Sequence, residues 1–258
     1  MAQAGALTEA PSTMLEANKR LIVALDVPSV DEARSIVDDL DGLVSFFKVG
    51  LHLQVRPGIE GLLESLGDAG KDIFLDYKLG DIGETMRGGV AGAAARRVRF
   101  LTIQGSGDLT EEHVAAALSG KAHGLPGILR VTLLTSLGEA DAQAAYGKSV
   151  PELVLMRARQ AKAWGCDGVI ASGREAKAIK EELGPDFLVI TPGIRPRGAA
   201  VGDQKRVVTP GQAIEAGADY LVVGRPIVKA KPGKRLAEAE AIIAEMTEAL
   251  EEMKEAAG

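Results

Sequence analysis

Eight short apolar runs recur along this chain, and their arrangement limits the folds open to it more than any other feature. They cover residues 21–25, 44–49, 73–75, 100–103, 128–134, 168–171, 187–190 and 220–223. Most are nearly continuous in Val, Ile, Leu or Phe rather than alternating with polar residues, which is typical of parallel strands buried on both faces. The sequence therefore predicts a parallel sheet that is enclosed by other elements.

Segments with helical spacing lie between the runs. One helix is expected from a cap at Ser29 or Asp31 to about Leu40, and another where the capping residue Thr209 precedes Pro210. Further helical patterns cover residues 59–66, 111–118, 153–164, 175–183 and 236–253. Eight strand–helix repeats predict an α/β fold, a single-domain (β/α)8 TIM barrel over residues 20–258, for which ~250 residues is a typical length.

A doubly wound open sheet is the alternative architecture. The segment that begins at Gly105 lacks the third glycine of a dinucleotide-binding fingerprint, and this favours the barrel. Residues 1–19 are predicted to be an N-terminal extension with a short helix. No Gly-, Pro- and Ser-rich linker divides the remaining residues, so one catalytic domain is expected.

Composition indicates the cellular location that we expect and excludes some classes of partner. With 36 acidic and 30 basic residues the net charge is −6, so the chain as a whole does not attract nucleic acid or anionic membranes. The single cysteine, Cys166, cannot form an internal disulfide, and the N-terminus lacks a basic start and an apolar segment. No apolar run approaches the ~20 residues of a membrane span. A cytoplasmic protein with no nucleic-acid or membrane partner is expected.

Charged residues stand where the predicted strands end. The first strand ends at Asp26 and the second carries Lys48. The third carries Asp76 and Lys78, two residues apart and therefore on one side of the strand, with Asp81 in the loop beyond. The chemistry of (β/α)8 barrels lies at this end of the strands. A row of structural ion pairs is the alternative, but such charges are costly to bury without a function.

The loops after the seventh and eighth strands predict a phosphate site. The first is long, contains Gly and Pro, and carries Arg195. The second places Gly224 and Arg225 before Pro226 at a helix start. Barrels of this class bind phosphate with these two loops, and Arg offers paired donors to phosphate oxygens. A solvated helix cap is the alternative for Arg225.

Other signals are weaker. Thr135 and Ser136 end the fifth strand, where their hydroxyls could bind a ligand or cap the next helix. The three histidines, His52, His113 and His123, lack the spacing of metal ligands. No cofactor fingerprint is present. Neither a metal nor a cofactor is therefore expected, although the many Asp and Glu residues leave a magnesium site open.

Together these residues resemble the orotidine 5′-phosphate decarboxylase family. The shared motifs lie in the family's order between residues 25 and 227 and read ALD, KVG, DxKxxDI, LTS, TPGIRP, GDQ and GRPI. DxKxxD also occurs in related sugar-phosphate decarboxylases and synthases, whereas TPGIRP followed by GDQ and GRPI is more specific to the orotidylate branch. The resemblance implies cofactor-independent decarboxylation of orotidine 5′-phosphate to uridine 5′-phosphate, the last step of de novo UMP synthesis.

The resemblance also implies roles for the charged residues. Asp26 is expected to hold the ribose, and Lys48 to contact the ribose and the carboxylate network. Asp76 and Lys78 are expected to flank the reacting carbon, with Lys78 as the proton donor. Asp81 is expected to complete this catalytic set of Lys48, Asp76, Lys78 and Asp81 from the neighbouring subunit.

The remaining roles concern the dimer and the ends of the nucleotide. Thr85, like Asp81, is expected to reach into the neighbour's site, which implies a homodimer with shared active sites. Thr135 or Ser136 is expected to read the pyrimidine edge. The phosphate is expected to be bound by a set of four residues, Arg195, Gln204, Gly224 and Arg225.

Three positions depart from the family's pattern. The family commonly has His and Pro where this chain has Gly80 and Gly83, and His where it has Gln104. Two rival functions remain at this stage. One is a metal-dependent sugar-phosphate decarboxylase or lyase on the same barrel, and the other is a non-catalytic sensor of a phosphate ligand.

Overall fold

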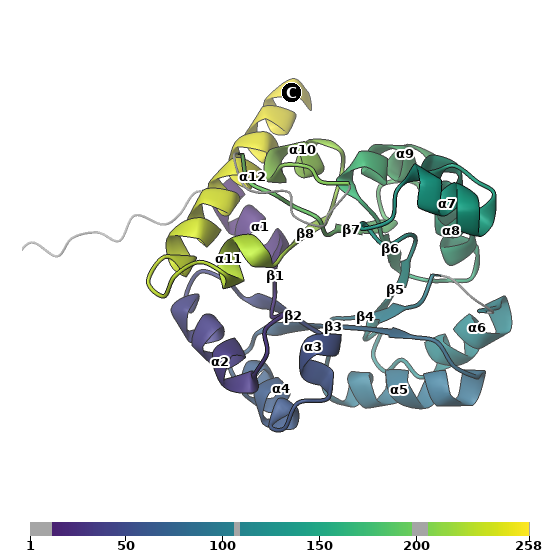
Figure 1. Ribbon diagram of the computed structural model, residues 1–258, viewed down its shortest axis with the longest axis horizontal. Helices are drawn as coiled ribbons and strands as arrows, with labels where there is room; N and C mark the ends of the chain where they lie inside the picture. Colours follow the sequence, from purple (N-terminus) through teal and green to yellow (C-terminus); the bar gives the residue numbers. More distant parts are fainter. Residues whose placement is uncertain (1–11, 106–108, 198–205, 258) are drawn as a thin grey trace, which may run out of the picture.

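The computed structural model describes residues 12–105, 109–197 and 206–257. Eight parallel strands form a closed ring that is surrounded by helices (Figure 1). The strands are β1 (Leu21–Ala24), β2 (Phe46–Gly50), β3 (Asp72–Leu79), β4 (Phe100–Ile103), β5 (Gly127–Val131), β6 (Gly168–Ile170), β7 (Leu188–Thr191) and β8 (Tyr220–Val223). Because β8 pairs with β1, the ring is closed, so the (β/α)8 barrel is confirmed and the open sheet is excluded.

Helices follow the strands around the outside of the ring. They are α1 (Ser12–Arg20), α2 (Val30–Asp39), α3 (Leu51–Gln54), α4 (Ile59–Asp68), α5 (Gly83–Ala95), α6 (Glu111–Ser119), α7 (Glu139–Tyr146), α8 (Val150–Ala163), α9 (Gly173–Leu183), α10 (Pro210–Glu215), α11 (Arg225–Val228) and α12 (Arg235–Ala257). The Ser29 hydroxyl caps α2 by accepting from the Glu32 N–H, and Thr209 caps α10 in the same way. None of the described helices is long and apolar enough to cross a membrane.

Several elements differ from the sequence-based expectation, among them the unexpected short helices α3 and α7. The fifth strand ends at Val131 rather than at residue 134. Beyond it the carbonyls of Leu133 and Leu134 accept hydrogen bonds from the Arg206 side chain instead of from a neighbouring strand. Helix α5 was not expected, because Ala and Gly dominate its sequence and its apolar pattern is weak.

Two apolar layers hold the barrel together. The outer layer lies between the strands and the helices, and it includes Ala17 of α1, which packs on α12. The inner layer fills the barrel and contains three of the five phenylalanines, Phe46, Phe74 and Phe100. Phe46 and Phe100 pack on each other at a centroid separation of 5.6 Å, and both pack on Tyr220, at 5.2 Å for Phe100. Phe74 packs on Phe100. We call these four residues the aromatic floor, since they fill the interior below the polar strand ends.

Strand β3 is irregular where it passes its charged residues. Leu75 pairs with Leu101 of β4, but the next paired residue, Leu79, is opposite Ile103. Four residues of β3 therefore advance alongside two of β4, which makes a bulge. Within it Lys78 has φ of 50°, a left-handed conformation that costs a residue with a side chain about 1–3 kcal/mol. The bulge moves the end of β3 out of a regular ladder.

Candidate active site

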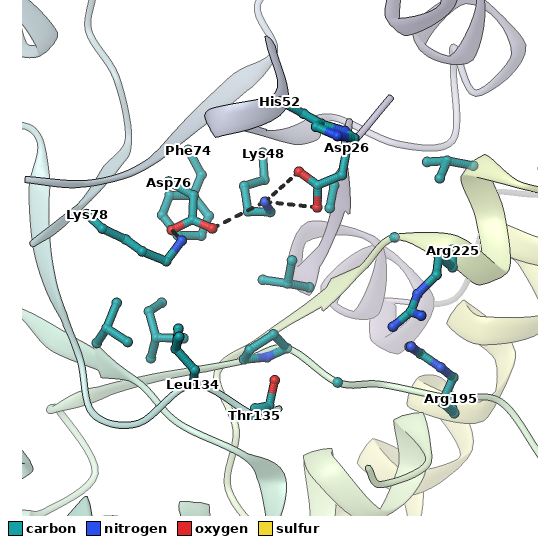
Figure 2. Close-up of a pocket in the computed structure, with 18 of the residues that line it drawn as sticks. Asp26, Lys48, His52, Phe74, Asp76, Lys78, Leu134, Thr135, Arg195 and Arg225 are labelled. Carbon is teal, nitrogen blue, oxygen red and sulfur yellow. Dashed lines mark hydrogen bonds and ion pairs between the residues drawn. The ribbon is translucent and has the colours of Figure 1, made fainter. Parts of the chain in front are cut away.

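A cavity of about 490 Å³ opens at the carboxyl ends of the strands (Figure 2). This volume is within the range of small-molecule sites. Its lining includes eight of the residues expected to form a site, namely Asp26, Lys48, Asp76, Lys78, Thr135, Arg195, Gly224 and Arg225. Phe74, from the aromatic floor, lies at its base, because it precedes Asp76 by two residues on the same side of β3.

Four of these side chains form a row of alternating charge that crosses the end of β1 and the neighbouring strands β2 and β3. Lys48 Nζ lies 3.1 Å from Asp26 Oδ1 and 3.2 Å from Asp76 Oδ2. Asp76 Oδ1 in turn accepts from Lys78 Nζ at 2.8 Å. Figure 2 shows the row running from Asp26 through Lys48 and Asp76 to Lys78 at one end of the cavity. Every charge in the row faces an opposite charge.

Burial and neighbours set the protonation of this row. Burial alone lowers the pKa of the Lys48 ammonium, but the carboxylates of Asp76 and Asp26 outweigh it and raise that pKa above its usual value. Burial likewise pushes the pKa of Asp76 up, and Lys48, Lys78 and the Thr102 hydroxyl together hold it below its usual value. Lys48 is therefore cationic and Asp76 anionic near neutral pH.

The backbone around Lys78 is tied to the next strand. Its N–H donates to Thr102 Oγ1 at 2.9 Å, and that hydroxyl donates to Asp76 Oδ1 at 3.0 Å. Thr102 is fully buried on β4. The side chain of Lys78 is about one-third exposed, and it extends from a fixed base toward the space where a ligand would lie.

Cationic groups gather at the opposite end of the cavity. Arg195, from the loop after β7, and Arg225, at the start of α11, lie side by side there in Figure 2. Lys229 lies one helical turn beyond Arg225 and also lines the cavity. Gly193 and Gly224 bring backbone to the same end. This end of the cavity can bind a dianion such as a phosphate monoester.

A buried ion pair joins the loops on this side of the barrel. Arg206 NH1 lies 3.0 Å from Glu175 Oε2, and both side chains are buried. Arg206 also donates to the carbonyls of Leu133 and Leu134, next to Thr135 in the cavity wall. Burial raises the pKa of Glu175, and Arg206 only partly offsets this. The loops after β5 and β7 are thus held together behind the cavity.

Three of the expected site residues that the structure describes do not line this cavity. The Asp81 side chain is exposed and accepts from the Ile82 N–H at 2.7 Å. Thr85 is exposed on α5, and Ser136 is half-buried in the loop after β5. Gln204 lies outside the described residues.

Three further residues belong to the site's surroundings and were not anticipated. His52 and Lys229 line the cavity, and Thr102 contacts the charged row from behind. The position of Lys229 four residues after Arg225 was a signal that helical spacing could have used. Among the described ranges, no group of three His, Cys, Asp or Glu side chains is placed to hold a metal ion.

The arrangement suits charge-based chemistry on an anionic ligand. The arginine end can hold a phosphate, and the lysine of the row can stabilise negative charge and donate a proton at the other end. The carboxylates orient both lysines, and they raise the pKa of Lys48 against its burial. The cavity between the two ends has room for a ligand about the size of a nucleotide.

Comparisons with known proteins agree with this chemistry. The family model described as "Orotidine 5′-phosphate decarboxylase / HUMPS family" matches residues 19–242. An orotidine 5′-phosphate decarboxylase of Afipia carboxidovorans is 47% identical over 241 residues, 93% of this chain and 98% of the relative. One from Rhodopseudomonas palustris is 46% identical over 89% of this chain and 95% of the relative. The crystal structure of the Lactobacillus acidophilus orotidine 5′-phosphate decarboxylase matches with a TM-score of 0.74 and 35% identity, covering 88% of this chain and 99% of that one.

Proposed function

This chain belongs to the orotidine 5′-phosphate decarboxylase / HUMPS family, and from that premise we infer that it decarboxylates orotidine 5′-phosphate to uridine 5′-phosphate and CO2. It is a carboxy-lyase of pyrimidine biosynthesis. The observation that carries this function is the row of Asp26, Lys48, Asp76 and Lys78, placed across one cavity from Arg195 and Arg225. The comparisons give no support to the sugar-phosphate lyase or to the sensor.

We propose that Lys78 is the catalytic acid. When the bond between the pyrimidine ring and its carboxylate breaks, CO2 leaves and the electron pair stays on the ring carbon. A lysine ammonium beside that carbon stabilises the developing carbanion and then delivers its proton to it, which gives uridine 5′-phosphate. Water returns the proton to Lys78 afterwards. The 2.8 Å contact with Asp76 supports this role because it orients the ammonium.

Asp76 is proposed to act on the substrate's carboxylate. Two like charges about 4 Å apart repel by roughly 4 kcal/mol at an effective dielectric near 20, and this repulsion disappears as CO2 departs. Asp76 remains an anion because the two lysines hold its pKa down against burial. Lys48, shared by Asp26 and Asp76, keeps both carboxylates in place. Asp26 is proposed to hold the ribose.

The remaining substrate contacts are proposed for the opposite end and the side wall. Arg195, Arg225 and the Gly224 backbone would bind the phosphate, remote from the reacting carbon, where binding energy can be used to position the ring. Gln204, which lies outside the described residues, is proposed to join them. Thr135 is preferred over Ser136 as the pyrimidine contact, because Thr135 lines the cavity.

We also propose a homodimer in which each site receives Asp81 and Thr85 from the partner. Both side chains are exposed and lie outside the cavity of their own chain. Ile82, directly after Asp81, is 66% exposed, an unusual position for an isoleucine on a free surface. Within the described part of the chain Lys78 pairs with Asp76 and the Asp81 carboxylate binds the Ile82 N–H, so the role expected of Asp81 is assigned to a partner. A cytoplasmic location is proposed alongside, consistent with a single buried cysteine.

The test is a decarboxylation assay on the purified chain. Orotidine 5′-phosphate is added in the presence of a chelator, and CO2 release and the pyrimidine absorbance are followed. We expect full turnover with the chelator present and none from Lys78→Ala, whose fold is checked by circular dichroism and thermal unfolding. Turnover that the chelator abolishes would favour the metal-dependent rival. Uridine 5′-phosphate binding without any turnover would favour the sensor.

A further inference from the structure

Thr102 stands directly behind the charged row on a strand that contributes no charge to it. Its side chain is fully buried on β4, and its one hydroxyl makes two hydrogen bonds. It accepts from the Lys78 N–H at 2.9 Å and donates to Asp76 Oδ1 at 3.0 Å. Asp76 Oδ1 also accepts from Lys78 Nζ at 2.8 Å. The backbone of Lys78, Thr102, Asp76 and the Lys78 ammonium therefore form a closed ring of contacts.

This ring lies where the regular pairing of β3 with β4 is interrupted. Between Leu75 and Leu79 the register shifts, and the residues between them leave the ladder. Lys78 sits there with φ of 50°, a conformation that side-chain-bearing residues rarely adopt and that persists only where the surroundings enforce it. The Thr102 hydroxyl takes the place of a strand carbonyl as acceptor for the Lys78 N–H.

The hydrogen bond that the same hydroxyl donates sets the orientation of the Asp76 carboxylate. By binding Oδ1 it fixes the rotation of the carboxylate, so Oδ2 faces Lys48 at 3.2 Å. A hydroxyl can accept from an N–H and donate to a carboxylate at once. Val has the same shape as Thr but can do neither, and Ser can do both.

We propose that Thr102 is a positioning residue for the decarboxylation, holding the strained backbone of Lys78 with its acceptor side and the Asp76 carboxylate with its donor side. The proposal rests on the function inferred above, in which Lys78 is the proton donor. Thr102 itself does not line the cavity, so it acts through these two residues rather than on the substrate.

The experiment compares Thr102→Val, Thr102→Ser and a matched control, Thr132→Val. Thr132 is also fully buried, and its hydroxyl donates to the Ile170 carbonyl at 2.7 Å, away from the charged row. We expect Thr102→Val to lower kcat about ten- to a hundredfold, the usual cost of a lost hydrogen bond to a charged group, with KM for orotidine 5′-phosphate little changed. Thr102→Ser should keep most of kcat. Thr132→Val should lose stability but keep kcat.

The pH profile of kcat gives a readout that a merely structural role would not move. Asp76 faces Lys48 from β2, Lys78 from its own strand and Thr102 from β4, with Asp26 of the first strand's end beyond Lys48. Removing a donor to the ionised carboxylate raises its pKa. Because Asp76 must be ionised to act, the acid limb for Thr102→Val should move to higher pH, while that for Thr132→Val should stay.

Equal kcat for the Val and Ser variants, or wild-type kcat in Thr102→Val, would overturn the proposal. A crystal structure of Thr102→Val separates this outcome from a failure of the inferred function. If wild type does not decarboxylate orotidine 5′-phosphate, the inferred function is wrong. The backbone conformation of Lys78 in the crystal structure of Thr102→Val then shows whether Thr102 holds Lys78 in place. The positioning of Lys78 and Asp76 by Thr102 holds, apart from the reaction, if Lys78 has left its left-handed conformation in that structure, and it is wrong if Lys78 and Asp76 are unchanged.

Discussion

Gly80 and Gln104 meet at the end of β3, immediately before Asp81. A Cβ atom at residue 80 would lie 2.3 Å from Gln104 Cδ and 2.4 Å from its Nε2. Contacts this short require the end of the Gln104 side chain to move, so Gln104 occupies the space that a side chain at position 80 would need. Two of the departures from the family's pattern are therefore one local arrangement, in which each residue depends on the other.

Replacing Gly80 tests this dependence. In the wild-type background Gly80→Ala should destabilise the protein, because the Gln104 amide must move aside. In a Gln104→Ala background the same change should be neutral or stabilising by about 0.4–1 kcal/mol, since Ala restricts the unfolded chain more than Gly does. Urea unfolding of wild type, both single variants and the double variant measures the coupling. Additive changes would show that the two residues are independent.

Arg225 gives a second prediction at the residue scale. Arg225→Ala should weaken the binding of uridine 5′-phosphate by about ten- to a hundredfold, the cost of roughly 1.5–3 kcal/mol for a lost charge-assisted contact. Uridine, which has no phosphate, should bind wild type and variant alike. Isothermal titration of both ligands provides the comparison, with Arg56→Ala as the control from the same rim, because Arg56 does not line the cavity. Equal weakening of both ligands would give Arg225 a structural role.

Individual residues were predictable from the sequence where they follow a buried run. Asp26, Lys48, Asp76 and Lys78 each stand at or near a strand end, and parallel strands bring such ends together. Thr102 was not predictable in this way. Its contact with Lys78 depends on a bulge of β3, and an irregular register leaves no periodic trace in the sequence.

At the scale of elements, two aspartates fasten neighbouring strands at the amino-terminal end of the barrel. Asp167 precedes β6 and accepts from the Ile128 N–H at 2.6 Å and from Lys121 Nζ at 2.8 Å. Asp219 precedes β8 and repeats the pattern with the Val189 N–H at 2.6 Å and Lys180 at 2.7 Å. Because the same contacts recur at two distant strand–helix repeats, we interpret both aspartates as structural residues. The amino-terminal end of such barrels contributes to stability rather than to catalysis.

We therefore expect Asp219→Ala to lower stability without lowering activity. The Val189 N–H loses its partner, which costs roughly 1–3 kcal/mol when the group is buried. Chemical unfolding should show this loss, and kcat measured well below the melting temperature should stay at the wild-type value. Asp41→Ala, which removes an exposed ion pair with Lys71, is the control and should leave stability nearly unchanged. A fall in kcat for Asp219→Ala would link this end of the barrel to the site.

Elements were predictable where their apolar pattern was strong. The helices that carry large apolar side chains, such as α2, α4 and α9, were expected, as were all eight strands. Helix α5 was missed because its buried face consists of Met86, Val90, Ala93 and Ala94, two of which are only weakly apolar. Its small residues instead allow close packing on α6, where a Cβ atom at Gly83 would lie 2.8 Å from the Cβ atom of Ala116.

At the scale of the whole molecule, the proposed sharing of active sites between subunits can be tested by mixing two inactive variants. If Asp81 serves the partner's site, mixing Lys78→Ala with Asp81→Ala subunits should restore activity to two inactive proteins. In a hybrid dimer one site has lost both residues and the other has both, so random exchange of equal amounts should restore about one quarter of wild-type activity. Subunit exchange is verified by native mass spectrometry. Exchange without recovered activity would place Asp81 in the site of its own chain.

The closed barrel itself was predictable from the number of apolar runs and from their buried character. The proposed dimer could not be predicted from the apolar pattern. A single chain shows that residues such as Ile82 and Thr85 are exposed, but it does not show which partner surface would cover them. Only the resemblance to a family suggested it. Association between subunits depends on surface shape, which a periodic pattern does not encode.

The aromatic floor determines how substrate can enter the site and how products can leave it. The side chains of the aromatic floor fill the barrel interior, so no channel runs through the barrel in the part of the chain that the structure describes. The site opens only at the carboxyl ends of the strands. Substrate, gas and nucleotide product must all use the mouth at which Arg195 and Arg225 lie. The phosphate contacts proposed for these two arginines must then also break before the product can leave.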